Sequence, residues 1–268
     1  MDSVITIPAL GDNFIYLYRY NRSNALLVDP SDASLVLGTL KEHGLDLTTI
    51  LATHHHWDHT AGIIELKEKT GCKVIGGDKQ RIPGTDSAVE DGKILAIGNT
   101  KIQVIATPGH TRTAVCYYVQ PSNDNKNGIL WTGDTLFIGG CGRLLECDAR
   151  SMWDSLLKLA SLPDDTLVYC GHDYTVENYQ FALSIEPSNQ AVKQCLSEVR
   201  QAQRAGRQTV PFRRVAATAQ QATMLRERIT NPFLRADTSE IKTALNMPQA
   251  QAVEVFAELR RRKDGFFV

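Results

Sequence analysis

The sequence predicts an α/β protein that is rich in strands over its first two thirds and helical over its last third. Short apolar or alternating runs, rich in Val, Ile, Leu and Tyr, recur up to about residue 170 and are separated by turn-forming Gly, Asp and Asn. After His172 the alternation stops, and apolar residues recur three or four apart, as on one face of a helix. We therefore expect a strand-rich domain over 1–173 and a helical domain over 174–268, a length that supports substantial cores.

The periodicity and the turn signals place the individual elements. The expected strands are 4–8, 14–20, 25–29, 49–53, 73–76, 101–107, 114–119, 129–132 and 166–170. The expected helices are 32–43, 60–70, 148–160 with Asp148 as N-cap, 188–205 ending before Gly206, and a last one that starts near Pro248 and presents Val253, Phe256 and Leu259 on one face.

Composition excludes several classes of function. A formal net charge of -1 with 22% charged residues gives no global field that would attract nucleic acid. No stretch of 18 uninterrupted apolar residues occurs, and the N-terminus lacks a basic region followed by an apolar one. The six cysteines include no Cys-x-x-Cys pair and are expected to be reduced and mostly buried. We expect a soluble, cytoplasmic, monomeric protein with no membrane or nucleic-acid partner.

The segment 54–59 concentrates metal ligands directly after the apolar run 49–52. His54, His56, Asp58 and His59 occur in the order His-x-His-x-Asp-His. A turn leaving a buried strand can point the first two one way and the last two another, so two metal ions can share this loop. The isolated His43 and the intervening His55 are expected to be ordinary polar residues.

Three further ligand types follow apolar runs in the same way, each just after a glycine. They are His110, Asp134 and His172. Because strand ends tend to gather at one edge of such a fold, we expect all seven side chains to form one site. One ion would take His54, His56 and His110, a second ion would take Asp58, His59 and His172, and Asp134 would bridge them.

This ligand set is typical of a catalytic centre. Imidazoles and carboxylates without thiolates suit two divalent ions, zinc first, with iron or manganese as alternatives. Three protein ligands and a bridge leave open positions, and metals about 3.5 Å apart can bind one hydroxide between them. A metal-stabilised binding module without activity is the competing hypothesis. Asp29 is either a partner for a ligand imidazole or a cap of the following turn.

At this point the sequence resembles the metallo-β-lactamase superfamily, through Thr53–His59 and the blocks around His110, Asp134 and His172. Within it, the chain is similar to glyoxalase II, the hydroxyacylglutathione hydrolases. The segments that carry this closer resemblance are Leu10–Asn13, Gly139–Arg143, Tyr174–Asn178, Asn231–Arg235 and Arg260–Asp264.

The resemblance implies an αββα metallo-β-lactamase sandwich that carries two metals, followed by a C-terminal α-helical domain that contacts glutathione. By position, the glutathione moiety would be held by Arg143, Tyr174, Asn178, Arg260 and Lys263. The implied reaction is hydrolysis of S-D-lactoylglutathione and related S-2-hydroxyacylglutathione thioesters to glutathione and a 2-hydroxy acid, as in methylglyoxal detoxification. The hydroxide between the metals would attack, with Asp58 or Asp134 orienting it.

Some features depart from the family or leave alternatives. Leu145 stands where the family usually has an aromatic hydroxyl, and the segment 212–230 is longer than usual. The run 260–263 is also typical of a solvated helix end, whose cations suit the helix dipole. The alternative function is that of a mononuclear iron persulfide dioxygenase, an oxidoreductase of the same superfamily that acts on glutathione persulfide.

Overall fold

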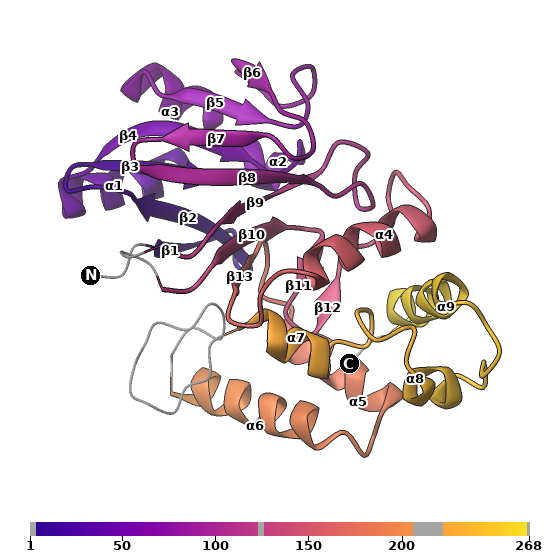
Figure 1. Ribbon diagram of the computed structural model, residues 1–268. Helices are drawn as coiled ribbons and strands as arrows, with labels where there is room; N and C mark the ends of the chain where they lie inside the picture. Colours follow the sequence, from indigo (N-terminus) through magenta and orange to yellow (C-terminus); the bar gives the residue numbers. More distant parts are fainter. Residues whose placement is uncertain (1–3, 123–125, 206–221, 267–268) are drawn as a thin grey trace. The chain divides into compact units, whose positions relative to one another are not determined.

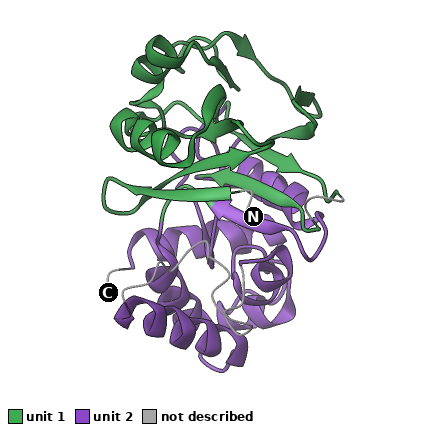
Figure 2. Cartoon of the chain, turned by 90° about the vertical axis from the view of Figure 1, so that its left-hand side faces the viewer, with its two compact units in different colours: residues 1–107, 113–133, 170–172 green, residues 108–112, 134–169, 173–268 purple. Residues whose placement is uncertain are grey.

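The computed structural model describes residues 4–122, 126–205 and 222–266 (Figure 1). The described residues separate into two compact units, coloured differently in Figure 2. The first unit lies within 1–107, 113–133 and 170–172, and the second within 108–112, 134–169 and 173–268. The chain therefore passes several times from one unit to the other.

The first unit contains a sheet of six strands in chain order. These are β1 (Val4–Ala9), β2 (Asn13–Arg19), β3 (Asn24–Val28), β4 (Asp46–Ala52), β5 (Lys73–Gly76) and β6 (Ser87–Ala88). The strands β1 to β3 pair antiparallel, whereas β3 to β6 pair parallel. The parallel crossovers contain α1 (Ala33–His43), α2 (Trp57–Thr60) and α3 (Ile63–Thr70). Since β3 and β4 are parallel neighbours, the residues that follow them emerge at the same edge.

This sheet is buried on both faces. One alternating set of side chains, including Leu17, Leu27 and Ile50, packs in a core with Val36 of α1 and Leu66 of α3. On the opposite face, Tyr18 of β2 meets Trp131 with ring centroids 5.5 Å apart. A sheet covered on both sides needs nearly continuous apolar strands, and the sequences of β2, β3 and β4 meet that need.

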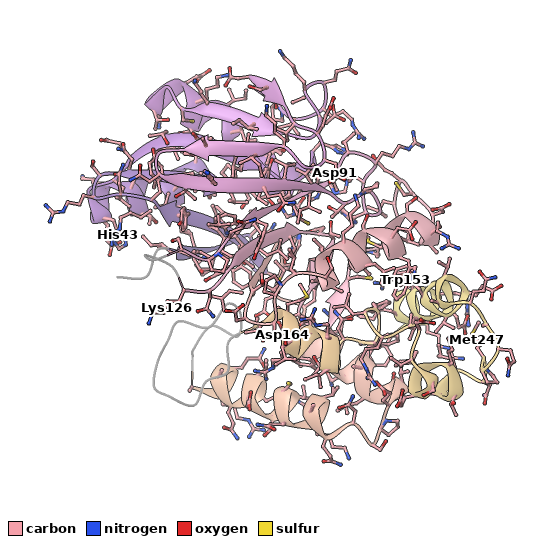
Figure 3. The ribbon with its side chains drawn as sticks, viewed as in Figure 1. His43, Asp91, Lys126, Trp153, Asp164 and Met247 are labelled. Carbon is pink, nitrogen blue, oxygen red and sulfur yellow. The ribbon has the colours of Figure 1, made fainter. Side chains whose placement is uncertain are left out.

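The covering layer on that face is a second, antiparallel sheet. Its strands β7 (Ile94–Ile97), β8 (Thr100–Ala106), β9 (Val115–Val119) and β10 (Ile129–Gly133) are neighbours in this order. The two sheets are joined by hydrogen bonds as well as packing, because the buried Tyr117 hydroxyl donates to the Ala52 carbonyl at 3.0 Å. Asp91, labelled in Figure 3, accepts from the Ala106 amide at 2.7 Å and ties the end of β8 to the turn before β7.

The second unit is mainly helical. It contains the hairpin β11 (Leu136–Phe137) and β12 (Gly140–Cys141), α4 (Ala149–Ala160), most of β13 (Leu167–Cys170), α5 (Thr175–Ile185), α6 (Gln190–Arg204), α7 (Met224–Thr230), α8 (Ser239–Ala244) and α9 (Ala252–Asp264). Aromatic rings fill its core. Phe233 lies 5.8 Å from Phe181 and 5.9 Å from Phe256, and Trp153 (Figure 3) lies 6.0 Å from Phe256.

The predicted α/β fold class is confirmed, and each expected strand and helix has a counterpart. The expected strand 49–53 begins earlier, at Asp46, and the helix expected near Pro248 begins at Ala252. The sequence did not predict β6, β7, the β11–β12 hairpin, α2, α5, α7 or α8. Gly206 and the first part of the segment 212–230 lie outside the described residues. His43 is exposed at the end of α1, as expected (Figure 3).

Among the residues that the structure describes, no helix is long and apolar enough to cross a membrane. The described cysteines are all free, and Cys147 is the one of them that is not buried.

A buried carboxyl group lies among the helices of the second unit. Glu227 of α7 is 0% exposed, and its Oε2 accepts from the Gly139 amide at 2.8 Å and from Asn231 Nδ2 at 2.9 Å. Burial raises the pKa of Glu227 to about 7, against the hydrogen bonds from Asn231 and Gly139 and the nearby charge of Arg226. The phenol of Tyr179, on α5, also interacts with the Glu227 carboxyl group. Glu227 is therefore protonated in much of the folded protein at neutral pH.

The change Glu227→Gln should remove a pH dependence of stability. Because the folded pKa is raised from 4.5 to about 7, the stabilisation by Glu227 is full below about pH 4.5 and is lost as pH rises through about 7. At about 1.4 kcal/mol per pKa unit, the loss is at most roughly 3 kcal/mol. In urea unfolding, the free energy of unfolding of the variant should rise relative to that of the wild type from pH 5 to 8. A difference between the two that does not change with pH would contradict this.

Asp148 caps α4, as the sequence predicts, because its carboxylate accepts from the Ser151 amide at 2.9 Å. Asp148→Ala should lower the free energy of unfolding by about 1 kcal/mol, since an amide at the helix start loses its partner. The control is Asp154→Ala on the same helix, an exposed position where the change should have little effect. Equal losses for the two variants in urea unfolding would argue against the cap.

Candidate active site

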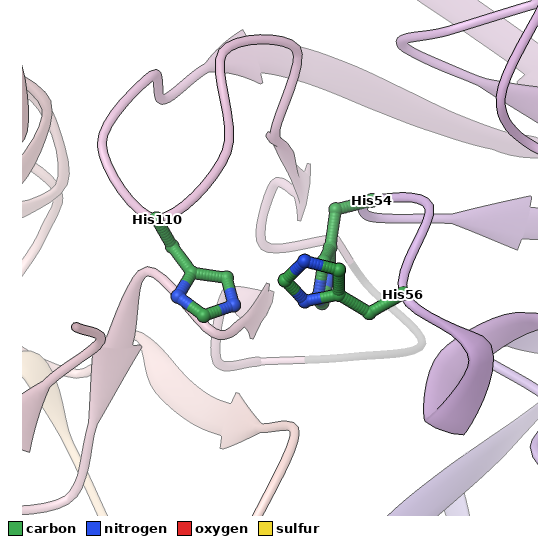
Figure 4. Close-up of side chains that lie close together, drawn as sticks. All are labelled: His54, His56 and His110. Atoms are coloured by element: carbon green, nitrogen blue, oxygen red, sulfur yellow. The ribbon is translucent and has the colours of Figure 1, made fainter. Parts of the chain in front are cut away.

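The ligand-rich segment leaves β4 and enters α2 in the first unit. Figure 4 shows His54 and His56 on this loop, and His110 on the turn that follows β8. His54 is 1% exposed, and its Nε2 lies 3.1 Å from Nδ1 of His56. The sharp exit from a buried strand thus brings these two predicted ligands together.

A second group of predicted ligands converges in the same unit. Nε2 of His59 lies 3.2 Å from Nε2 of His172, and Oδ2 of Asp58 lies 3.4 Å from the latter nitrogen. One ligand atom from each of the three residues lies within 4.8 Å of the others. His172 lies two residues after the end of β13.

Carboxylates fix the orientation of both imidazoles. Nδ1 of His59 lies 3.0 Å from Oδ2 of Asp29, and Nδ1 of His172 lies 2.9 Å from Oδ1 of Asp12. A carboxylate accepts, so we assign the proton of each ring to Nδ1, which leaves both Nε2 atoms with lone pairs. Two lone pairs only 3.2 Å apart repel unless a proton or a cation lies between them. The donor set therefore fits a divalent metal ion.

Asp29 also holds the loop itself. Its Oδ1 accepts from the Thr53 amide at 2.7 Å, and its Oδ2 accepts from the Thr53 hydroxyl at 2.6 Å. Of the two hypotheses for Asp29, this contact supports the partner of a predicted ligand imidazole, His59. Gly133, with φ 47°, faces the same threonine: a Cβ there would lie 2.3 Å from Thr53 Oγ1. Only glycine fits at this crossing.

Two other predicted ligands lie together in the second unit. Nε2 of His110 is 3.5 Å from Oδ2 of Asp134, and its Nδ1 is 2.9 Å from the Arg143 carbonyl, which orients the ring. The backbone is tightly packed here, because a Cβ on Gly142 would lie 1.9 Å from the Asp134 carbonyl oxygen. The glycine run before Arg143 therefore serves close packing around Asp134.

The second unit contains a pocket of about 480 Å³. It is lined by the two ligands His110 and Asp134 and by all five residues expected to hold glutathione: Arg143, Tyr174, Asn178, Arg260 and Lys263. Its remaining lining residues are Phe137, Cys141, Gly142, Glu177, Asp264 and Phe266. The roles of these residues in binding remain predictions.

The C-terminal basic run divides into two kinds of side chain. Arg261 and Arg262 are exposed and pair with Glu258, as in a solvated helix end. Arg260 is instead 6% exposed and lies over the Phe233 ring, with its Nη1 donating to the Cys141 carbonyl at 2.8 Å. Lys263, one turn later, also turns inward. The positions of Arg260 and Lys263 therefore match the glutathione hypothesis better than the solvated one.

Both inward cations already have carboxylate partners. Arg260 pairs with Asp264 at 3.0 Å, and Lys263 pairs with Glu177. These two acids are not among the site residues predicted from the sequence. Both could have been noticed from their neighbours, because Glu177 lies within the Tyr174–Asn178 segment and Asp264 ends the Arg260–Asp264 segment.

The other lining residues restrict the chemistry of the pocket. Tyr174 stacks edge-on against Phe137, with ring centroids 5.2 Å apart, and Asn178 Nδ2 donates to the Ile138 carbonyl at 3.0 Å. Burial raises the pKa of the Cys141 thiol to about 11. Because a thiol with that pKa is protonated at neutral pH, Cys141 is not a nucleophile there.

The first unit therefore brings together His54, His56, Asp58, His59 and His172, and the second brings together His110, Asp134 and the five expected substrate contacts. Sequence reasoning missed Asp12, whose partner lies 160 residues away. It also missed Asn13, whose Nδ2 donates to the Asp58 carbonyl at 2.8 Å. The polar turn that contains both residues was the available signal.

Two family models together match nearly the whole chain. Residues 9–172 match the family described as the metallo-beta-lactamase superfamily, and residues 173–266 match the hydroxyacylglutathione hydrolase C-terminus. A hydroxyacylglutathione hydrolase of Rhodospirillum rubrum is 46% identical, covering 97% of both chains. One of Methylococcus capsulatus is 42% identical, covering 99% of both.

The fold also matches a solved structure of ETHE1 from Myxococcus xanthus, with a TM-score of 0.62 and 23% identity over 98% of this chain and 99% of the other. At that identity the match supports the fold alone. The relatives matched over nearly the whole chain are more similar in sequence and carry the hydrolase name. The chain therefore belongs to the hydroxyacylglutathione hydrolase family of the metallo-β-lactamase superfamily.

Proposed function

We propose that the protein hydrolyses S-D-lactoylglutathione and related S-2-hydroxyacylglutathiones to glutathione and a 2-hydroxy acid. The observation that carries the proposal is the pocket in which His110 and Asp134 occur together with three cations, Arg143, Arg260 and Lys263. Glutathione has two carboxylates, and Arg and Lys side chains bind such groups. The names of the relatives that match nearly the whole chain support the same substrate class.

The proposed ligand set for two divalent ions is that expected from the sequence. His54, His56 and His110 would hold one ion; Asp58, His59 and His172 would hold the other; Asp134 would bridge them. The imidazole and carboxylate donors favour zinc, with iron or manganese as alternatives. When bound, such ions supply Lewis acidity at the thioester carbonyl and lower the pKa of a bound water toward neutrality.

The residues of the chain have three tasks in this proposal. Asp29 and Asp12 keep His59 and His172 in the tautomer that offers Nε2. Asp58 or Asp134 accepts a hydrogen bond from the attacking water and orients it. The glutathione thiolate is a good leaving group, so no separate protein acid is required.

The direct test is thioesterase activity with protein loaded separately with zinc, iron or manganese. We expect two ions per chain and turnover of S-D-lactoylglutathione, and Asp134→Ala should lower kcat/KM by on the order of 10²–10³-fold because a bridging carboxylate is lost. The exposed change Asp237→Ala is the matched control and should leave kcat/KM unchanged.

A single iron per chain, with oxygen consumption on glutathione persulfide and no thioesterase activity, would instead support the dioxygenase. Unfolding on chelation, with no activity under any metal, would support a binding module. The domain division at residue 173, the monomeric state and the cytoplasmic location remain predictions.

Leu145 gives a test of substrate contact. Its side chain is 57% exposed, two residues after Arg143, and it cannot donate the hydrogen bond that an aromatic hydroxyl would supply. Leu145→Tyr should lower KM about fivefold, equivalent to about 1 kcal/mol, with kcat unchanged. Leu145→Phe, which adds the ring alone, should match the wild type; an equal gain from Phe would assign the effect to packing.

A further inference from the structure

The hairpin of β11 and β12 is held by side chains from three helices and from the residue that ends α7. Glu227 Oε2 accepts from the Gly139 amide at 2.8 Å. Asn231 Nδ2 donates to the Gly140 carbonyl at 2.9 Å and to the Phe137 carbonyl at 3.4 Å. The carbonyls of Ile138 and Cys141 accept from Asn178 and Arg260, respectively. Each residue from 137 to 141 thus gives one backbone group to a side chain distant in sequence.

Glu227 and Asn231 differ from the other two members of this clamp. Both are 0% exposed, and neither lines the pocket. They bind each other at 2.9 Å, so each fixes the orientation of its partner. Asn231 is also fixed from the other side, because its Oδ1 accepts from the Phe233 amide at 3.0 Å. Any effect of this pair on the pocket must therefore pass through the hairpin or through Phe233.

The hairpin lines the pocket, and Phe233 acts on it through Arg260. Phe137 and Cys141 line it, and the Cys141 carbonyl is the acceptor that docks the Arg260 guanidinium. The same guanidinium lies over the Phe233 ring, 5.0 Å from its centroid. The base of the hairpin is held separately, by the Gly142 amide donating to the Thr135 carbonyl at 3.2 Å. Loosening residues 137–141 should therefore displace the pocket wall more than it displaces Asp134.

We propose that Glu227 and Asn231 are positioning residues that set the affinity of the pocket for its substrate by fixing the 137–141 hairpin and the Arg260 guanidinium. The substrate named in the test rests on the proposed function, whereas the clamp itself does not. This assigns a purpose to the Asn231–Pro232–Phe233 segment, which contacts no reacting group in the proposed mechanism.

The test compares Glu227→Leu, which removes the acceptor, with Glu227→Gln, which keeps an acceptor oxygen of similar reach. With metal-loaded protein and S-D-lactoylglutathione, the Leu variant should raise KM about tenfold, since the Gly139 amide loses its acceptor and Asn231 Nδ2 loses one of its three. It should leave kcat within about twofold. The Gln variant should restore KM to within about twofold of the wild type. Exchange of the Gly139 amide hydrogen, followed by NMR, should be fast in the Leu variant and slow in the Gln variant.

One further variant is a control for packing, and another replaces Glu227→Leu if that variant does not fold. Met224→Leu changes the packing of α7 at another fully buried position and should alter neither KM nor the exchange of Gly139. If Glu227→Leu does not fold, Glu227→Asp shortens the side chain by one methylene and should raise KM and speed the exchange of Gly139 to a smaller degree.

An unchanged KM in a folded Leu or Asp variant would overturn the proposal, as would a loss confined to kcat or a Gln variant that behaves like Leu. If the wild type fails to hydrolyse the thioester, it is the proposed function that fails. The exchange of Gly139 in the Leu and Gln variants then still decides whether Glu227 holds the hairpin.

Discussion

The candidate centre depends on two hydrogen bonds that are made outside the metal position. Asp29 and Asp12 each accept a hydrogen bond from the Nδ1–H of an imidazole, and this leaves the Nε2 lone pairs of His59 and His172 facing each other. In water, two neutral imidazoles would turn away from such a contact. In the protein, the buried rings cannot turn without losing a carboxylate partner, so their contact favours a proton or a cation between the two nitrogens.

The order of the strands places Asp29 beside the ligand-rich loop. Asp29 follows β3 and His54 follows β4, and because these strands are parallel neighbours, the two residues emerge at the same edge. The same carboxylate then binds the Thr53 backbone, so one residue orients a ligand and shapes the loop that carries the others. The left-handed conformation of Asp29, with φ 52°, is the local strain that this double use requires.

The parts of this protein that sequence reasoning predicted are those whose signal is local. The alternation in β2 and the spacing from His54 to His59 both lie within a few residues. The β11–β12 hairpin was not predictable, because its strands are two residues long and its stability comes from Glu227 and Asn231, 88 and 91 positions away. Distant partnerships of this kind leave no periodicity in the sequence.

The helix α5 was not predicted from the sequence for a different reason. Asn178, Tyr179, Phe181 and Ala182 are all buried, so its apolar and polar residues do not separate onto two faces and the helical period is obscured.

The expected glutathione contacts, by contrast, came from resemblance alone. The run 260–263 shows why spacing could not supply them: two of its four cations are solvated and two line the pocket, a distinction that only the packing of α9 makes.

Two of the three pocket cations, Arg260 and Lys263, are paired with carboxylates within the protein, and this limits what their charge alone can contribute to substrate binding. Arg260 and Lys263 have side chains less than a tenth exposed, but their partners Asp264 and Glu177 are nearly half exposed. A substrate carboxylate would therefore exchange with a carboxylate already present, which can turn to water, and the net electrostatic gain of such an exchange is small. Selectivity must then come mainly from geometry, that is, from where the guanidinium is held by the Cys141 carbonyl and the Phe233 ring. The rigid hairpin thus becomes as important to recognition as the charges that the pocket displays.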